Sequence, residues 1–157
     1  MLEFKTPQIE DKAWVDQCFK HLKTMNCDYT FGNMFVWSTE YSTKICRFKD
    51  FFICSWGMGK ETNFGIPVGK GDFNEAVEEV IKYAKANDIM PRFYGVTEAY
   101  VEMLNENFPD AFQFSYDESY GDYIYEVEKM ASLKGKKYHG KRNHITNFKK
   151  NNPNWSF

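Results

Sequence analysis

Residues 62–96, TNFGIPVGKGDFNEAVEEVIKYAKANDIMPRFYGV, hold the pattern that decides the fold. Short apolar runs over 62–69 and 91–96 predict two strands. Between them, apolar residues at helical spacing predict a helix over 72–88 that begins at the capping residue Asp72. The apolar stripe consists of Phe73, Ala76, Val77, Val80, Ile81 and Ala84. Strands that alternate with helices in this way indicate a sheet covered by helices.

Upstream of this stretch the sequence predicts one strand, two helices and a hairpin. The strand is expected over 2–6, and the helices over 11–25 and 30–41, where apolar side chains recur at helical steps. The period then changes to two over 42–57, which predicts a hairpin that turns near Asp50. The upstream region therefore supplies two further strands of the sheet and two helices to cover it.

Downstream, the pattern predicts a helix over 98–108, two antiparallel strands over 111–117 and 121–128, and a basic helix over 136–150. The full order of elements predicts a mixed α/β (α+β) domain with three layers around one twisted sheet. We expect this domain to span 1–130. Residues 131–157 are then expected to form a basic connector helix, which Gly140 interrupts, and the start of a truncated second half.

Charge is distributed unevenly along the chain. Residues 1–133 hold 13 basic and 22 acidic side chains, a net charge of −9, whereas residues 134–157 hold seven basic side chains and no acidic one. Such a basic end suits either a polyanion or an acidic protein surface. Across 157 residues, an apolar content of 43% and an aromatic content of 18% predict a folded domain with a sizeable core.

No part of the sequence has the features of an export signal or a membrane span. The opening residues MLEFKTPQIEDK lack the apolar stretch of a signal peptide, and no run of 18 apolar residues occurs. The four cysteines, at positions 18, 27, 46 and 54, form no CxxC pair and no metal-type spacing. They are therefore expected to be reduced thiols in a cytoplasmic protein.

The turn before the central helix is the first candidate binding site. Gly69 and Gly71 flank Lys70 immediately before the helix start at Asp72. Free N–H groups at a helix start bind anions, glycines let a phosphate approach closely, and lysine adds a positive charge. The alternative is an ordinary strand-to-helix turn that uses glycine for its φ angles. The Asp72 carboxylate would also compete with an anion for the N–H groups.

The basic C-terminal segment is the second candidate. The residues expected to hold phosphate groups of a donor are Lys136, Lys137, Lys141 and Arg142. They alternate with aromatic side chains, an arrangement that suits contact with a nucleic acid. The alternatives are a solvated helix face, or a helix paired with an acidic protein surface. Its apolar stripe is thin, so this helix is expected to be marginal unless it docks on something.

Polar side chains among the aromatic residues form a third candidate set. The residues expected to line a cleft are Asn33, Trp37, Asp122 and Tyr123. Taken alone, Trp37 is more typical of a core position. His139 and His144 are five residues apart, which does not place them on one helical face, so no metal site is expected. Cys18 and His21 are three residues apart on one predicted helix, and both are interpreted as structural. The sequence assigns no catalytic base.

The order of elements resembles the GNAT acyltransferase fold. The tetrapeptide GKGD, residues 69–72, falls where that fold keeps its pyrophosphate loop. Members that bind acetyl-CoA usually have Gln or Arg, two residues, Gly, one residue, then Gly or Ala. Here Gly69 and Gly71 fill the glycine positions, whereas Ile66 stands in place of Gln or Arg. The resemblance implies a GNAT-like fold, with acyl-CoA as one candidate donor.

Longer phrases resemble the phosphatidylglycerol lysyltransferase C-terminal-like family, which is related to Fem-type peptidyltransferases. They are DYTFGNMFVWSTEY (28–41), IPVGKGD (66–72), DYIYEVEKMASLKGKKYHGKRNHITNF (122–148) and NWSF (154–157). Members of this family have two GNAT-like halves in tandem. The resemblance covers about residues 4–157. It implies that this chain is the first half and the connecting helix, cut shortly after the second half begins.

The resemblance implies transfer of an acyl group, from aminoacyl-tRNA or acyl-CoA, to an amine or lipid acceptor. A lone first half is expected to be inactive, because the transfer cleft depends on the second half. The competing hypothesis is a non-catalytic interaction module whose basic helix docks on a partner or on a second copy. A sequence-independent nucleic-acid binder is a third interpretation, and the acidic pI of 5.9 argues against it as the main role.

Overall fold

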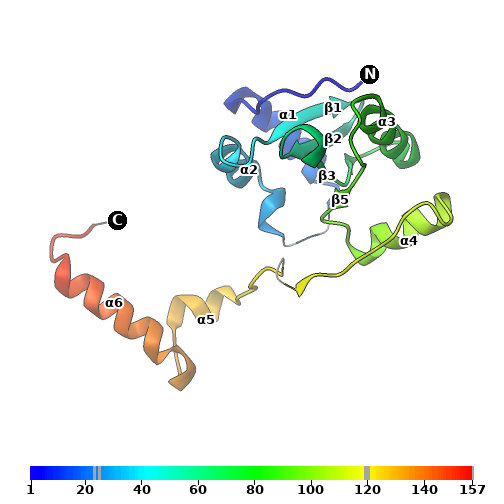
Figure 1. Ribbon diagram of the computed structural model, residues 1–157. Helices are drawn as coiled ribbons and strands as arrows, with labels where there is room; N and C mark the ends of the chain where they lie inside the picture. Colours follow the sequence, from blue (N-terminus) through cyan, green and yellow to red (C-terminus); the bar gives the residue numbers. More distant parts are fainter. Residues whose placement is uncertain (23, 25, 119–120, 157) are drawn as a thin grey trace. The chain divides into compact units, whose positions relative to one another are not determined.

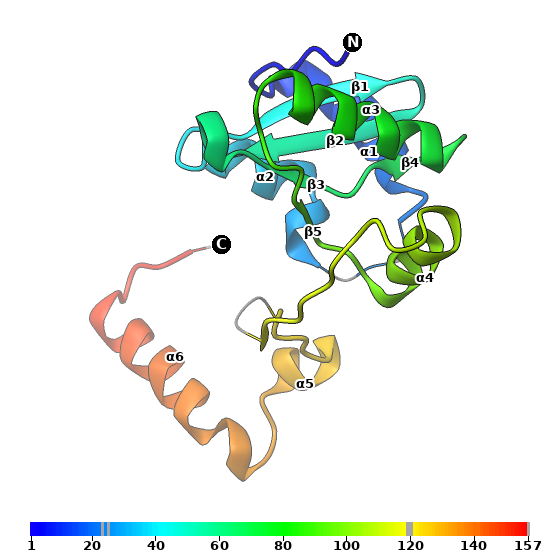
Figure 2. The same cartoon turned by 45° about the vertical axis from the view of Figure 1, so that its right-hand side comes forward.

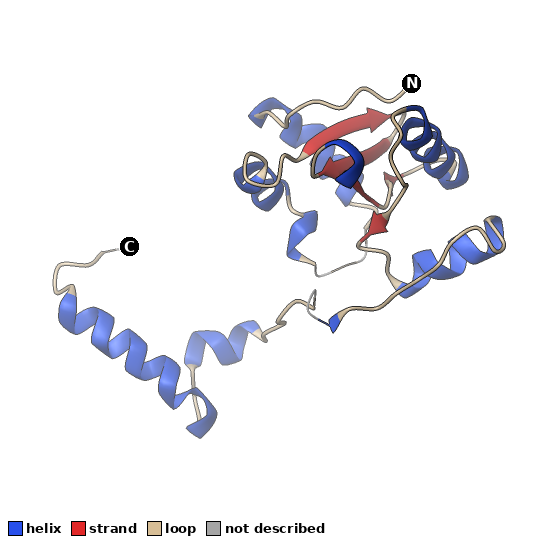
Figure 3. Ribbon diagram, viewed as in Figure 1, coloured by secondary structure: helices blue, strands red, loops and turns tan. Residues whose placement is uncertain are grey.

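The computed structural model describes every residue except Lys23, Met25, Ser119, Tyr120 and Phe157. It divides into unit 1, residues Met1–Tyr120, and unit 2, residues Gly121–Phe157. Helices combine with a mixed sheet (Figure 1 and Figure 3), so the predicted mixed α/β class is confirmed.

The sheet of unit 1 has five strands. They are β1 Lys44–Phe48, β2 Phe51–Trp56, β3 Asn63–Gly65, β4 Val68–Gly69 and β5 Phe93–Tyr94. Their order is β1-β2-β3-β5, and β4 pairs with β2 beside β3. β1, β3 and β4 each run antiparallel to β2, whereas β3 and β5 run parallel. The hairpin predicted over 42–57 is confirmed as β1 and β2.

The α-helices among the described residues of unit 1 are α1 Lys12–Phe19, α2 Phe31–Trp37, α3 Phe73–Ala86 and α4 Glu98–Asn107. Figure 2 shows them from a second direction. The Asp72 side chain accepts a hydrogen bond from the backbone N–H of Glu75, and so caps α3 as the sequence predicts. α3 also supplies the connection that parallel strands require, because it leads from β4 to β5.

The core forms on both faces of the β1–β2 hairpin, because successive strand residues point to opposite sides. On β2, Ile53 packs with α3 residues and Phe52 with residues of α1 and α2. The buried cluster at α3 consists of Leu2, Cys46, Ile53, Phe64, Val80 and Ala84. The buried cluster at α1 and α2 consists of Val15, Cys18, Phe31, Met34, Ile45 and Phe52. A third cluster joins Val77 to Leu104 of α4.

Three upstream elements are shorter than the sequence predicts. The strand expected over 2–6 is a single bridge between Lys5 and Ile45. The helix expected over 11–25 ends at Phe19. The N–H groups of His21 and Leu22 then donate to the carbonyls three residues before them, which closes the last turn. Met25, its predicted last apolar residue, lies outside the described residues. The helix expected over 30–41 ends at Trp37. Ser38 is the next residue, and its hydroxyl donates to the backbone carbonyl of Phe35 at the helix end.

The strands predicted over 111–117 and 121–128 were wrong for the residues that the structure describes. No strand occurs there, and α5, Val127–Ser132, begins inside the second range. Tyr116 and Tyr123 are 87% and 89% exposed. Alternating aromatic residues met the period of a strand, but a strand also needs a neighbouring strand for its backbone hydrogen bonds. These segments have none among the described residues of their units.

Unit 2 consists of α5, a short 3-10 helix at Lys136–Tyr138, and α6 at His139–Asn151. The predicted basic helix is therefore present. Gly140 does not interrupt it, contrary to the prediction. Gly140 lies in the first turn of α6, where a helix tolerates residues that its interior disfavours. A β-carbon at this position would meet no neighbouring atom within 4 Å among the described residues.

A buried carboxylate ties the N-terminal segment to α1. The Asp11 carboxylate accepts hydrogen bonds from Lys5 Nζ at 2.6 Å, from Trp14 Nε1 at 2.9 Å and from the backbone N–H of Gln8 at 2.9 Å. Burial alone would favour the protonated acid. The three donors outweigh it and hold the pKa of Asp11 below its usual value. The folded state therefore binds a proton at Asp11 less tightly than the unfolded state does.

We expect Asp11→Asn to lower the free energy of unfolding at pH 7 by about 1–3 kcal/mol, because charge-assisted hydrogen bonds are lost. A lowered pKa stabilises the fold above the unfolded pKa of about 4, and this contribution disappears as the pH falls through the folded pKa. The difference in the free energy of unfolding between the wild type and Asp11→Asn should therefore shrink below about pH 4. Urea unfolding between pH 3 and pH 7 measures this. The exposed Glu106→Gln control should show no such convergence.

Candidate functional site

The glycines of the 69–71 turn are explained by close packing against the hairpin. A β-carbon on Gly69 would lie 2.1 Å from the carbonyl oxygen of Asp50 and 2.8 Å from Cα of Phe51, because β4 pairs with β2 at this point. The backbone N–H of Lys70 donates to the same Asp50 carbonyl at 3.3 Å. Gly71 has a φ of +137°, which favours glycine. The N–H of Lys70 is therefore engaged by the protein, and its side chain is the group left for a ligand.

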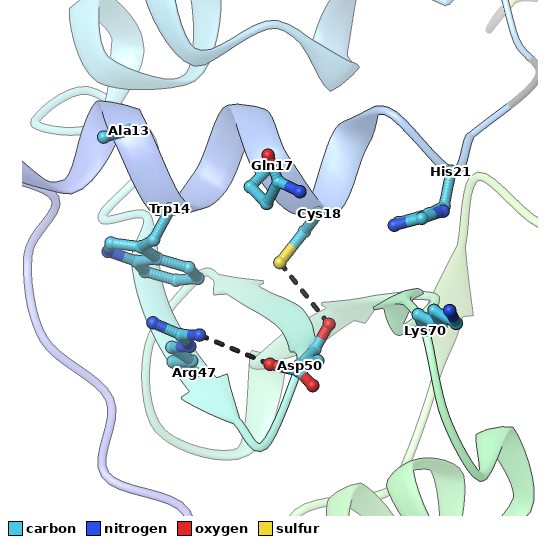
Figure 4. A pocket seen from close by; sticks show the side chains of 8 residues that line it. All are labelled: Ala13, Trp14, Gln17, Cys18, His21, Arg47, Asp50 and Lys70. Atoms are coloured by element: carbon cyan, nitrogen blue, oxygen red, sulfur yellow. Dashed lines mark hydrogen bonds and ion pairs between the residues drawn. The ribbon is translucent and has the colours of Figure 1, made fainter.

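The Lys70 side chain lines an open pocket of about 500 Å³ in unit 1 (Figure 4). The pocket lies between α1, the β1–β2 turn and the turn before α3. Its lining residues are Ala13, Trp14, Gln17, Cys18, His21, Arg47, Asp50 and Lys70. We call it the α1 pocket. It brings Lys70, which the sequence predicted to bind phosphate, together with side chains that the sequence did not assign to any site.

Positive charge predominates in the α1 pocket. Arg47 lies 5.9 Å from the centre of the Trp14 ring, donates to the carbonyl of Lys49 at 3.0 Å and pairs with the Asp50 carboxylate at 3.4 Å. Lys70 has no carboxylate partner among the described residues. His21 and Lys70 lie on the same side of the pocket in Figure 4. A small anion therefore fits the charge of this pocket better than a cation does.

Cys18, Cys46 and Cys54 are not arranged as nucleophiles. Cys18 Sγ lies 3.5 Å from the carbonyl oxygen of Asp50, and burial raises the pKa of the Cys18 thiol. Burial likewise raises the pKa of Cys46, and that of Cys54 to about 12. A thiol that stays protonated at neutral pH is a weak nucleophile, and all four cysteines are free thiols. Cys18 and His21 both line the pocket, yet no feature of it activates Cys18.

The basic residues of unit 2 have two different kinds of environment. Arg142 Nη1 donates to the carbonyl of Leu133 and, at 2.8 Å, to that of Gly135, so it ties α6 to the end of α5. Leu133 has a φ of +47°, and its carbonyl is one that a helix end leaves unpaired. Arg142 therefore stabilises the turn between α5 and α6, and its predicted contact with phosphate stays a prediction.

The three predicted lysines of unit 2 are exposed. Lys141 Nζ lies 5.3 Å from the centre of the Tyr125 ring, while Lys136 and Lys137 begin the short helix that precedes α6. None of the three pairs with a carboxylate among the residues that the structure describes. Their ammonium groups are thus available to phosphate groups of a ligand.

The four predicted cleft residues belong to separate units. Asn33 donates to the carboxylate of Asp28 at 3.0 Å, and Trp37 is half-exposed with its ring 5.9 Å from that of Tyr41. Asp122 and Tyr123 belong to unit 2. A single cleft made of all four is not described within either unit, so this set stays a prediction.

Sequence reasoning missed Trp14, Arg47 and Asp50 as members of a pocket. The alternation of residues along the predicted hairpin placed Arg47 on the same face as Ile45 and Lys49. This was the one sequence signal that could have indicated its place in the pocket. Packing of α1 on that face then decides which side chains meet. The described residues contain no group of three or more His, Cys, Asp or Glu side chains that could hold a metal ion. Within the same ranges, every helix is too short or too polar to cross a bilayer.

Comparisons with known proteins match this chain to a family and to a solved structure. The family model for phosphatidylglycerol lysyltransferase, C-terminal, matches residues 19–156. A conserved protein of unknown function from Bacteroides thetaiotaomicron, known from a crystal structure, is 30% identical with a TM-score of 0.81. The match covers 99% of this chain and 53% of that one, so this chain spans about half its relative's length. No curated protein matches.

Proposed function

The chain belongs to the phosphatidylglycerol lysyltransferase C-terminal family, and on that premise we propose that it is the GNAT-like first half of an acyl- or aminoacyl-transferase. The family resemblance drawn from its sequence motifs is thereby confirmed. The activity, the donor and the acceptor belong to the proposal. So does the requirement for a second half, since the matched relative is about twice as long.

The observation that carries the proposal is the connection β4–turn–α3–β5. β3 and β5 pair in parallel at Phe64 with Phe93 and at Gly65 with Tyr94, and α3 provides the crossover between them. The glycine-lysine turn stands directly before α3, where a GNAT-like fold binds the donor's pyrophosphate. Helices on both faces of the hairpin agree with the three layers of that fold.

The proposed reaction is direct transfer of an acyl group to an amine. The amine nitrogen forms a bond to the carbonyl carbon, the bond from that carbon to the donor's oxygen or sulfur breaks, and a base accepts the amine proton. Catalysis would come from positioning the two substrates and from hydrogen bonds to the developing oxyanion. No base is assigned in this chain, in keeping with the proposal that this half alone is inactive.

Donor phosphates are assigned to exposed cations. In unit 1 the proposed contact is Lys70, which stands between Gly69 and Gly71 in the sequence and lines the α1 pocket. In unit 2 the proposed contacts are Lys136, Lys137 and Lys141, while Arg142 keeps the segment in shape. A tRNA donor would use the unit 2 lysines, and a CoA donor would use Lys70. Both donors are cytoplasmic, so the proposal places the protein there.

The test is a titration with tRNA and with CoA at several salt concentrations. If tRNA is the donor, the logarithm of its association constant should fall linearly with the logarithm of salt concentration. The variant Lys136→Gln/Lys137→Gln/Lys141→Gln should flatten this slope by about 2 to 3 and weaken binding at least about tenfold at low salt. If CoA is the donor, Lys70→Gln should weaken CoA binding instead.

A matched control separates local contact from overall charge. The variant Lys12→Gln/Lys20→Gln/Lys85→Gln removes the same charge from exposed positions of unit 1 and should leave the slope nearly unchanged. Absence of both tRNA and CoA binding at low salt would count against the transferase proposal. Equal effects of the two triple variants would count against the assigned contacts.

A second candidate function is supported by apolar side chains on α6 and just beyond it. Ile145, Phe148 and Trp155 are 45%, 53% and 42% exposed, and the rings of Phe148 and Trp155 lie 6.3 Å apart. A non-catalytic module would use this surface, with its basic neighbours, to dock on a partner or on a second copy. Sedimentation that shows association with rising concentration, lost in Phe148→Ser, would favour this function over transfer.

A further inference from the structure

A second pocket of about 430 Å³ lies in unit 1 at the end of the β1–β2 hairpin opposite the α1 pocket. The α1 pocket includes residues of the hairpin turn, whereas this one includes Lys44 at the start of β1 and Ser55 near the end of β2. Seven of its lining residues are serine or threonine. We call it the hydroxyl pocket. Nothing in the proposed transfer reaction uses it.

Ser55 is the buried polar residue of β2 in the hydroxyl pocket. It is 6% exposed, and its hydroxyl makes no hydrogen bond to any residue that the structure describes. On β2 it points to the same side as Ile53, which packs against α3. The Ser55 oxygen is not one of the buried unpaired atoms of the described residues, so it reaches the solvent in the pocket. Its hydroxyl is therefore free to donate to a ligand that enters the pocket.

Lys44 brings a positive charge to the same place. Lys44 and Ser55 are direct partners in the β1–β2 register, so their side chains lie on one face next to each other. Lys44 Nζ donates to the Thr6 hydroxyl at 2.8 Å, and Thr6 also lines the pocket. Lys44 has no carboxylate partner among the described residues.

The carboxylates around the hydroxyl pocket do not neutralise Lys44. Asp88 pairs with Lys60, and Glu61 pairs with Arg92 at 3.5 Å. Among the described residues that line the pocket, none is acidic, and Lys44 is the one with a charge. The hydroxyls of Ser38 and Thr62 already donate to backbone carbonyls. The remaining hydroxyls around the ammonium group favour a bound anion, because they can donate to it while the ammonium supplies the opposite charge.

The remaining wall of the hydroxyl pocket is apolar. The rings of Phe4 and Tyr83 lie 4.9 Å apart, and Ile89 follows at the end of α3. Met58, on the β2–β3 connection, also lines the pocket and is largely exposed. A free inorganic ion would leave this wall uncovered, whereas a ligand with an apolar body would bury it.

We propose that the hydroxyl pocket binds a small anion carried on an apolar body, a phosphate monoester or a carboxylate whose charged group meets Ser55 and Lys44. The apolar body lies against Phe4 and Tyr83. The Ser55 hydroxyl donates to the anion, and the Thr6 hydroxyl keeps the Lys44 ammonium in place beside it. This site is independent of the transfer reaction and of the donor contacts assigned above.

The test is an NMR titration of the isotope-labelled full chain with phenyl phosphate, with phenylacetate and with the neutral benzyl alcohol. We expect amide signals of Lys44, Ser55 and their neighbours to shift with one or both anions. The neutral alcohol should bind at least about tenfold more weakly, because it lacks the charge. Comparing the two anions distinguishes a phosphate ligand from a carboxylate ligand.

Ser55→Ala and Lys44→Gln should each weaken anion binding about tenfold, as expected for loss of a hydrogen bond to a charged group. Lys44 is exposed, so Lys44→Gln should fold even if Ser55→Ala does not. In the exposed Lys85→Gln and in the α1 pocket variant Lys70→Gln, the signals of Lys44 and Ser55 should shift with the anion as they do in the wild type. The proposal is overturned if no signal shifts at millimolar anion, if the neutral alcohol binds equally well, or if Lys70→Gln alone abolishes the shifts.

Discussion

Replacing Gly69 by alanine should destabilise the protein by about 3 kcal/mol or more. The added β-carbon would lie 2.1 Å from the Asp50 carbonyl oxygen and 2.8 Å from Cα of Phe51. Both neighbours are backbone atoms, and no side-chain rotation relieves the overlap. β4 must therefore separate from β2, or the hairpin turn must move. Urea unfolding followed by far-ultraviolet circular dichroism measures the loss.

Gly32→Ala is the matched control for this prediction. Gly32 lies within α2, and no described neighbour stands within 4 Å of a β-carbon there. Alanine should stabilise the helix by about 0.5–1 kcal/mol, because glycine loses more conformational entropy on folding. A loss below about 1 kcal/mol for Gly69→Ala would mean that β4 does not approach the hairpin as closely as described. The packing explanation for the 69–71 glycines would then be withdrawn.

Phe52→Ala should cost about 3–5 kcal/mol, the usual range for emptying a large aromatic site in a core. Phe52 is 1% exposed, and its ring centre lies 4.9 Å from that of Phe19 and 6.0 Å from that of Trp14. Both neighbours belong to α1, which is too short to be stable without its packing. The cavity would therefore weaken the docking of α1 on the sheet and, with it, the wall of the α1 pocket.

Phe148→Ala provides the comparison, because that ring is 53% exposed in unit 2. Its replacement should change the unfolding free energy by less than about 1 kcal/mol. Tryptophan fluorescence and circular dichroism during urea unfolding give the two values. Equal losses for the two phenylalanines would show that the core is not where the buried clusters place it.

The repeating patterns of the sequence predicted the elements whose pairing is local. α3 was predicted with its cap at Asp72 because amphipathic spacing and capping depend on neighbours within one helical turn. The hairpin was predicted for the same reason, since its two strands adjoin along the chain. Family membership was likewise predicted from phrases of sequence, and the family model confirmed it.

Prediction failed where an element depends on a distant neighbour. The 111–117 and 121–128 segments alternate as strands do, yet the described residues provide no strand beside them. The sequence also did not predict that Arg142 bonds the carbonyls of Leu133 and Gly135, and its assignment to phosphate stays a prediction. A charge pattern does not reveal which carbonyls a helix end leaves unpaired, nor which side chain reaches them.

The sequence by itself determined most of the helices, the hairpin, the charge asymmetry and the family, because these follow from local spacing and from matched phrases. The tertiary structure decided what the 69–71 turn is for and which side chains share a pocket. Gly69 is required where two backbones meet, and Lys70 and Arg47 line one pocket because α1 packs across the hairpin. The same holds for Ser55 and Lys44, which line one pocket because they are partners in the β1–β2 register. The burial of a side chain and its hydrogen-bond partners depend on which residues pack around it, and local sequence does not encode this.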